Sequence, residues 1–281
     1  MHPLSSGGSP SKHGGLPPPA PPAPHTNRRP IRRTDEDVGR AAGYPRFYAA
    51  VAHAQLTGWL PGGSRFLIDI SGPGARAWEV AARAGHSVLR VVDRDMAPSP
   101  AGRPMAGGRL STVTADGADL RFLPDGCADG VIAEDRTLSL RLGAEDLVTE
   151  IARVLRPGGQ LLACVDSLTF GMALLAKQHR WPHLVDVPNA DVVLIPWPDG
   201  MITRCYGADQ LRELFTGSGL EVDWIRPRTV LSPRTVAYLL ARDPASFGEL
   251  VNAELNARSD DSVGAQLVTV CTKRPPDRVP A

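Results

Sequence analysis

The sequence has few cysteines, and they are scattered. Its 281 residues include only four, each far from the others along the chain: Cys127, Cys164, Cys205 and Cys271. No Cys-x-x-Cys pair is present, and no cysteine lies near a pair of histidines, which excludes a disulfide framework and the usual zinc-binding patterns. We therefore expect reduced thiols, mostly buried as small apolar side chains, no metal site and a cytoplasmic location.

The sequence also lacks a long apolar run. No stretch approaches the roughly 18 consecutive apolar residues that suggest a membrane-spanning helix. Residues 1–30 contain nine prolines and four glycines, and none of the continuous apolar segment that secretory signals carry. Neither a membrane span nor secretion is expected.

Acidic residues are missing from the first 34 positions, which carry five basic side chains. The other 247 residues then hold 26 basic against 30 acidic side chains, a formal charge of about −4. Nucleic-acid-binding domains are usually basic, with lysine and arginine gathered on one face. The body of the chain is therefore not expected to bind nucleic acid.

Composition divides the chain into a tail and one domain. The run LPPPAPPAP at 16–24 has too little apolar surface to offset the entropy of ordering. Residues 1–40 are therefore expected to form a disordered, basic tail rich in proline and glycine. Residues 41–275 have the length and composition of one folded domain, and 276–281 form a short C-terminal tail.

Apolar runs alternate with helical patterns along the domain. Short runs that predict strands lie at 65–70, 88–92, 111–115, 130–133, 160–165, 220–224 and 267–271. Apolar residues at helical spacing predict helices at 44–59, 75–84, 147–155, 211–215 and 233–257. Most of the strands are apolar throughout, which is typical of parallel strands covered on both faces. The pattern favours an α/β fold with a doubly wound, mostly parallel sheet.

Glycines and acidic residues follow the predicted strands. Gly72 and Gly74 come after the first strand, where the absence of side chains lets backbone N–H groups approach a ligand closely. Asp93 ends the second strand, and its carboxylate can accept two hydrogen bonds from a ribose diol. Asp116-Gly117 ends the third strand and suits a contact to an amino group beside a flat ring. Ligands of open parallel sheets bind beyond the carboxyl ends of the strands, so these residues are expected on one rim.

Two more acidic residues belong to this region. Glu134 ends the fourth strand, and Asp69 lies inside the short first strand. A buried carboxylate needs hydrogen-bond donors, which the backbone amides of the glycine turn would supply to Asp69. The turn alone does not identify its ligand, because GPGARA at 72–77 also satisfies the GxGxxG/A dinucleotide fingerprint.

Residues 64–166 resemble the core of the class I S-adenosylmethionine (SAM)-dependent methyltransferases, most closely the small-molecule type 11 group. Four motifs in order carry the resemblance, and together they are far more specific than any one of them. They are LIDISGPG at 67–74, RVVD at 90–93, ADGADLRFLPDGCADGVI at 115–132 and EIARVLRPGGQLL at 150–162. The segment 206–222 resembles the helix and strand that follow in the family.

The resemblance implies a Rossmann-like methyltransferase fold with a seven-stranded sheet, in which the last strand, near 267–271, runs antiparallel. Helical cap segments at about 167–205 and 231–262 would cover the methyl acceptor. The residues that the resemblance assigns to SAM are Asp69, Ser71, Gly72, Gly74, Asp93, Asp116, Gly117 and Glu134.

By this resemblance the methionine part of SAM would lie beside Asp69 and the two glycines, the ribose on Asp93 and the adenine amine on Asp116. Residues near Glu134 would face the methyl group. Ser71 departs from the family pattern, because it stands where a glycine is usual and its side chain would narrow the cofactor cleft.

The implied activity is transfer of a methyl group from SAM to a small-molecule acceptor. The sequence after the fourth strand, AEDRT, lacks the Asn/Asp-Pro-Pro-Tyr signature of enzymes that methylate exocyclic base amines. His179 and His183 are more typical of surface residues than of a general base, and no catalytic residue is assigned. Two alternatives stay open: a non-catalytic scaffold or regulator with the SAM-binding fold, and an NAD(P)-dependent oxidoreductase. Neither the acceptor nor the oligomeric state follows from the sequence.

Overall fold

A computed structural model describes residues 35–72, 74–93, 108–115, 119–187, 190, 192–197, 200–257 and 264–275, with side chains from Gly43 onward. Residues 1–34 of the predicted tail and the C-terminal tail 276–281 lie outside the described residues, as do Asp116 and Gly117.

Strands and helices alternate along most of the chain. Their order is α1 (Asp35–Trp59), β1 (Phe66–Asp69), α2 (Ala77–Arg83), β2 (Ser87–Val92), β3 (Leu110–Thr114), β4 (Ala128–Ala133), α3 (Ala144–Val154), β5 (Leu155–Ser167), α4 (Leu168–Lys177), α5 (Trp181–Asp186), β6 (Val193–Pro196), β7 (Ile202–Tyr206), α6 (Ala208–Gly217), β8 (Leu220–Arg228), α7 (Pro233–Arg242), the 3-10 turn η2 (Pro244–Ser246), α8 (Phe247–Leu255) and β9 (Gln266–Lys273).

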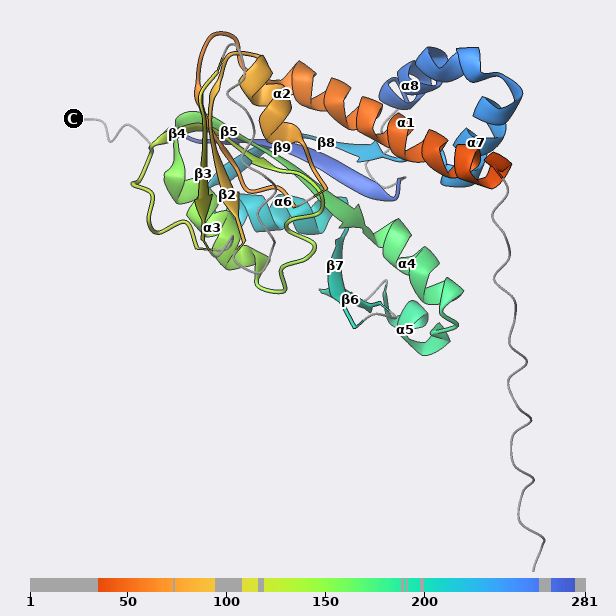
Figure 1. Ribbon diagram of the computed structural model, residues 1–281. Coiled ribbons are helices and arrows are strands. Elements are labelled where there is room, and N and C mark those ends of the chain that lie inside the picture. The colour runs from red at the N-terminus through yellow and green to blue at the C-terminus, as the bar shows by residue number, and fades with distance from the viewer. Residues whose placement is uncertain are drawn as a thin grey trace, which may run out of the picture.

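The strands form one mixed sheet (Figure 1). Seven of them follow the order β3-β2-β1-β4-β5-β9-β8, in which the first five are parallel and β9 runs antiparallel to both of its neighbours. This confirms the predicted mostly parallel seven-stranded sheet with an antiparallel last strand. The hairpin of β6 and β7 is an addition, which joins the sheet through a short parallel pairing of β7 with the end of β5.

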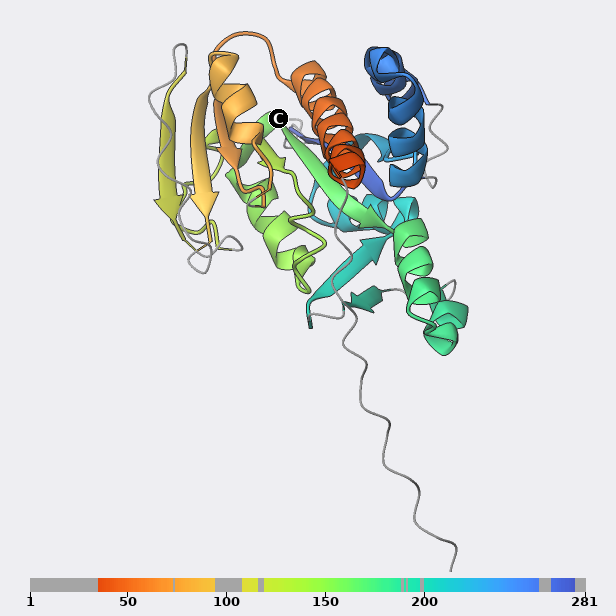
Figure 2. The same cartoon turned by 45° about the vertical axis from the view of Figure 1, so that its right-hand side comes forward.

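Helices cover both faces of the sheet (Figure 2). Neighbouring strand residues point to opposite faces, so Ile68 and Leu161 pack in the core under α3 and α6, whereas Leu67 and Leu162 pack in the core under α1 and α2. All four side chains are fully buried. This alternation explains why the strands are apolar on both faces, as the sequence pattern predicts.

The two predicted cap segments take different positions. The first, 167–205, forms α4, α5, β6 and β7, which project from the body around a small core of their own that includes Leu175 and Ile195 (Figure 1). The second, 231–262, forms α7 and α8, which pack against α1 through residues such as Phe47, Val51 and Val236. It therefore supports the helix that covers one face of the sheet.

Two boundaries differ from the prediction. Helix α1 begins at Asp35, inside the segment assigned to the tail. Strand β5 begins at Leu155, five residues before the strand predicted at 160–165. The extra residues pair once with β4, Ala128 opposite Leu155, before a register shift that Gly158 accommodates with a φ of 76°.

The four cysteines are free, and all except Cys127 are buried. Among the helices of the described residues, none combines the length and the apolar character that a membrane crossing requires.

Gly130 in β4 tests the packing of α1 on the sheet. A Cβ at this position would lie 2.9 Å from a Leu67 methyl group and 3.2 Å from the Trp59 ring. We expect Gly130→Ala to lower the free energy of unfolding by about 1–3 kcal/mol in urea denaturation, because the overpacked ring and methyl group must move. Gly217→Ala is the matched control, since nothing lies within 4 Å of its Cβ position. It should be neutral or stabilise by up to about 1 kcal/mol, and equal effects of the two variants would contradict the packing.

Candidate functional site

Asp69 lies at the base of the turn that follows β1. Its carboxylate is 1% exposed, and its Oδ1 accepts a hydrogen bond of 2.9 Å from the Ser71 N–H. Burial raises the pKa of Asp69, against the hydrogen bonds from Ser71 that lower it. Its Oδ2 has no hydrogen-bond partner among the described residues. The predicted donation from the turn to Asp69 therefore occurs at one oxygen, and the other is a buried acceptor.

Ser71 joins the ends of β1 and β4. Its Oγ accepts a hydrogen bond of 3.0 Å from the Glu134 N–H and lies 3.5 Å from the carbonyl oxygen of Ile132. The hydroxyl that was expected to narrow the cleft is thus directed at the neighbouring strand. Ser71 substitutes for the usual glycine as a tie between the two strands that carry the site.

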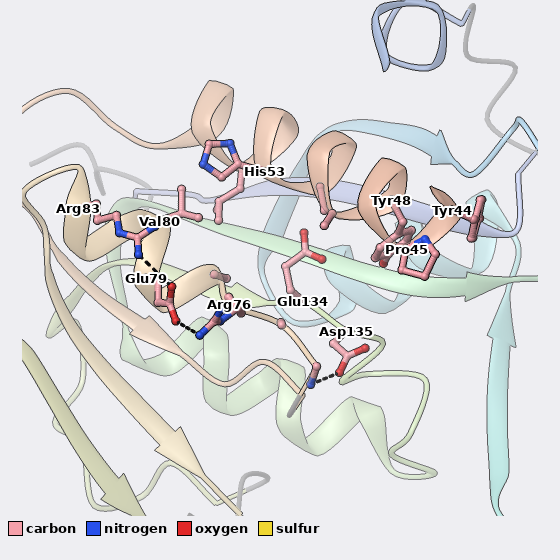
Figure 3. Close-up of a pocket in the computed structure, with 16 residues that line it drawn as sticks. Tyr44, Pro45, Tyr48, His53, Arg76, Glu79, Val80, Arg83, Glu134 and Asp135 are labelled. Carbon is pink, nitrogen blue, oxygen red and sulfur yellow. Dashed lines mark hydrogen bonds and ion pairs between the residues drawn. The ribbon is translucent and has the colours of Figure 1, made fainter. Parts of the chain in front are cut away.

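The glycine turn is in close contact with Asp135, the residue after Glu134 (Figure 3). The Gly74 N–H donates a hydrogen bond of 2.8 Å to Asp135 Oδ2. A Cβ would lie 2.6 Å from this oxygen if built on Gly72 and 2.9 Å if built on Gly74, so a side chain at either position would collide with it. Asp135 and Arg136 both have left-handed backbones, with φ of 57° and 61°, a conformation that non-glycine residues seldom adopt.

A cavity of about 250 Å³ lies at the carboxyl ends of β1 and β2. Ser71 and Gly72 line it from the turn, Asp93 from the end of β2, and Thr137 and Arg141 from the segment after β4. Asp93 Oδ2 accepts an ion-paired hydrogen bond of 2.8 Å from Arg141, and the two side chains are 31% and 27% exposed. The cavity thus brings Gly72 and Asp93, 21 positions apart in the sequence, to one place, as the strand-end argument predicts.

A second cavity, of about 630 Å³, lies between α1, α2 and the segment after β4 (Figure 3). We call it the α1–α2 pocket. Gly74, Glu134 and Asp135 line one side of it. The remaining lining is mostly apolar: Tyr44, Pro45, Tyr48, Ala49, Ala52, Leu56, Ala75, Ala77 and Val80, with His53, Arg76, Glu79 and Arg83 as polar members. Its volume and lining are typical of a pocket for a small organic molecule.

Glu134 is held by a buried arginine. Arg228, at the end of β8, is fully buried and donates hydrogen bonds of 2.8 Å to both carboxylate oxygens of Glu134. It also donates to Gln55 at 2.6 Å and to the Tyr48 hydroxyl at 3.3 Å, both on α1. Although burial lowers the pKa of Arg228, the Glu134 carboxylate raises it well above its usual value. The Glu134 carboxylate is therefore engaged on both oxygens.

The structure brings most of the predicted residues to one edge. Ser71, Gly72 and Asp93 share the smaller cavity, Gly74 and Glu134 line the α1–α2 pocket, and Asp69 is buried below the turn. Asp116 and Gly117 lie outside the described residues. His179 and His183 lie on the cap in or beside α5, and neither lines the cavities described above. Among the described residues, no cluster of three or more His, Cys, Asp or Glu side chains could hold a metal ion.

Three residues that contact these groups are not marked by any pattern in the sequence: Tyr48, Arg141 and Arg228. No local motif marks the two arginines, since the chain has 28 of them. Asp135 adjoins Glu134 in sequence, but its approach to the glycine turn depends on the left-handed backbone at 135–136.

A family model described as a methyltransferase domain matches residues 68–163, which run from β1 through β5. The strand order and the antiparallel β9 agree with the fold that the sequence motifs imply. This part of the chain is a class I SAM-dependent methyltransferase domain. The methyltransferase domain indicates SAM as the cofactor.

Solved structures of methyltransferases share the fold. A SAM-dependent methyltransferase from Methanosarcina mazei is 18% identical, with a TM-score of 0.51 over 78% of this chain and 97% of that one. The 1,6-didemethyltoxoflavin-N1-methyltransferase of Burkholderia thailandensis, solved with its substrate and S-adenosylhomocysteine, is 15% identical, with a TM-score of 0.53 over 85% of this chain and 87% of that one. A chain from the Haloferax volcanii complex of the Trm112 activator with a methyltransferase is 19% identical, with a TM-score of 0.52 over 87% and 100%. The comparison with curated proteins gave no match.

Arg228 generates the first prediction for the site. Arg228→Met leaves the Glu134 carboxylate buried without its partner, and we expect a loss of about 3–5 kcal/mol of unfolding free energy in urea denaturation. The double variant Arg228→Met/Glu134→Leu removes both charges and should regain most of that loss. A cost below about 1 kcal/mol for the single variant would contradict the role assigned to the ion pair.

Asp166, at the end of β5, generates a pH prediction. Burial raises its pKa to about 6, against the pairing with Arg136 at 3.3 Å that lowers it, and the side chain is 2% exposed. The folded state therefore holds this proton more tightly than the unfolded state, so Asp166 lowers stability as pH rises from about 4 to about 6. Relative to wild type, Asp166→Asn should gain up to about 3 kcal/mol of unfolding free energy between pH 4 and pH 7. Parallel stability curves for the two proteins would overturn the prediction.

Proposed function

We propose that this chain is an enzyme that transfers a methyl group from SAM to a small, mostly apolar molecule. The observation that carries the proposal is the meeting of Gly72, Ser71 and Asp93 at one cavity of the methyltransferase domain, directly beside the α1–α2 pocket. The four free cysteines suit the reducing cytoplasm, in which we propose that the enzyme works.

The donor set fits the cofactor. The Asp93 carboxylate at the cavity rim is suited to the two ribose hydroxyls, provided that Arg141 releases one oxygen. The Gly74 N–H, now bound to Asp135, is suited to a carboxylate oxygen of the methionine part. The unpartnered Asp69 Oδ2 is a buried acceptor under the same turn. We assign Asp116 and Gly117 to the adenine by the resemblance of their motif.

Methyl transfer from SAM requires little of the protein beyond positioning the acceptor. When bound, SAM supplies a methyl group on a sulfonium, which is already an activated electrophile. The chain's own residues then have to hold the acceptor in line and exclude water. Helix α1 forms one wall of the α1–α2 pocket, and Tyr44 and Tyr48 bring aromatic surface to it. Because Arg228 engages both carboxylate oxygens of Glu134, we assign this residue to the architecture of the methyl-transfer region and not to proton transfer.

The nature of the α1–α2 pocket supports a small acceptor. Its mostly apolar walls suit a compact organic molecule better than a polyanion, whose phosphates would meet Glu134 and Asp135. An organic ring or chain of that size is therefore our proposed acceptor class.

Calorimetry with SAM, S-adenosylhomocysteine and NAD(P)H tests the proposal against its alternatives. Binding of the first two without NAD(P)H supports a SAM-dependent protein, and methyl transfer to an added acceptor then separates an enzyme from a scaffold. Tight NAD(P)H binding without SAM binding would overturn the proposal.

Asp93 provides the residue-level test. Asp93→Ala should weaken S-adenosylhomocysteine binding at least about tenfold, because it removes the acceptor for two ribose hydroxyls. Thermal unfolding should show that the domain stays folded, since Asp93 is partly exposed at a strand end. An unchanged dissociation constant would show that the ribose does not bind at Asp93.

A further inference from the structure

Arg141 is paired with the Asp93 carboxylate, which we assign to the ribose. Its guanidinium donates to Asp93 Oδ2 at 2.8 Å inside the cavity that Ser71 and Gly72 line. Hydroxyl groups and a guanidinium compete for the same carboxylate lone pairs, and a charged donor binds them more strongly than a neutral one. A ribose that binds both carboxylate oxygens therefore competes with Arg141 for Asp93 Oδ2.

Asp135 is paired with the glycine turn as Arg141 is paired with Asp93. Its Oδ2 accepts the Gly74 N–H and lies against both glycines, at the position where a ligand carboxylate would approach the turn. Among the described residues this contact also separates the cavity at Asp93 from the α1–α2 pocket, because Gly72 lines the first, and Gly74 and Asp135 line the second. A ligand that extends from one cavity to the other must pass this point.

Both contacts come from one short segment, 135–141, which follows β4. It leaves the strand through two consecutive left-handed residues, Asp135 and Arg136. Non-glycine residues in such a backbone conformation persist where the surrounding contacts hold them. The contacts that this segment makes with Asp93 and Gly74 are also partly exposed. Exchanging them for contacts with a ligand therefore costs little free energy.

We propose that segment 135–141 is an internal competitor for the cofactor: Arg141 competes with the ribose for Asp93, and Asp135 competes with the ligand carboxylate for the Gly74 N–H. The two residues thereby set the affinity of the site, and each acts on a different part of the ligand. The inference rests on the proposed SAM site, but it reverses the usual expectation for polar residues in a binding cavity, because their removal should tighten binding.

Calorimetry with two ligands tests Arg141. Arg141→Ala should bind both adenosine and S-adenosylhomocysteine about 2- to 5-fold more tightly than wild type, the range expected for an exposed ion pair that no longer has to be broken. Arg274→Ala is the matched control, since it removes an exposed arginine paired with Glu221 at 3.2 Å, on a strand outside the site. It should leave both dissociation constants unchanged. Weaker or equal binding by Arg141→Ala would overturn the proposal.

The same ligands separate the role of Asp135. Asparagine tolerates the left-handed backbone and keeps an oxygen for Gly74, but it lacks the charge that opposes a ligand carboxylate. Asp135→Asn should therefore tighten S-adenosylhomocysteine and leave adenosine, which has no carboxylate, unchanged. Weaker S-adenosylhomocysteine binding would mean that Asp135 holds the ligand ammonium, and would overturn the competition.

Salt gives an independent measurement on the wild-type protein. Adenosine is uncharged, so raising salt from about 0.05 M to about 0.5 M should screen the Asp93–Arg141 pair and tighten adenosine binding, and Arg141→Ala should lose this dependence. If neither wild type nor the variants bind either ligand, the SAM site itself is wrong. If wild type binds and Arg141→Ala matches Arg274→Ala, the SAM site stands and the competition is excluded.

Discussion

The buried ion pair of Arg228 and Glu134 is the interaction on which the arrangement of this site depends. It joins the end of β8 to the end of β4, and through Tyr48 and Gln55 it fixes α1 over the sheet. An arginine removed from water in this way must have its donors satisfied, and here a carboxylate, an amide oxygen and a hydroxyl share them. Tyr48 and Glu134 both line the α1–α2 pocket, so Arg228 ties two sides of that pocket together.

The same pair decides what the site can do chemically. A carboxylate with a free oxygen beside the reacting atoms could serve as a general base. Both oxygens of Glu134 instead accept hydrogen bonds from Arg228. In the proposed function, the site relies instead on its shape, on the polar groups of the glycine turn and on Asp93. That division suits a reaction whose cofactor already carries the activated group, since orientation and exclusion of water then account for most of the barrier reduction.

The sequence predicts the parts of this molecule that depend on local pattern. Gly72, Asp93 and Glu134 could be located because each follows a strand, and the edge of a parallel sheet gathers such residues whatever the long-range packing. Arg141 and Arg228 could not, because their roles depend on partners 48 and 94 positions away and arginine is common throughout the chain. The start of α1 was missed for a related reason. An acidic run that follows a proline-rich tail is predicted to belong to that tail, although acidic residues also favour the first turn of a helix.

The position of β9 constrains how the chain can assemble. Gln266–Lys273 is the last described strand, yet it lies between β5 and β8 and pairs with both along most of its length. Until these residues leave the ribosome, β8 has no neighbour in the sheet. Arg228, at the end of β8, is then not held beside Glu134. The parallel half from β1 to β5 can form earlier, whereas completion of the sheet must wait for β9. A chain interrupted shortly before Gln266 would thus display an open edge on β5, which invites pairing with other chains.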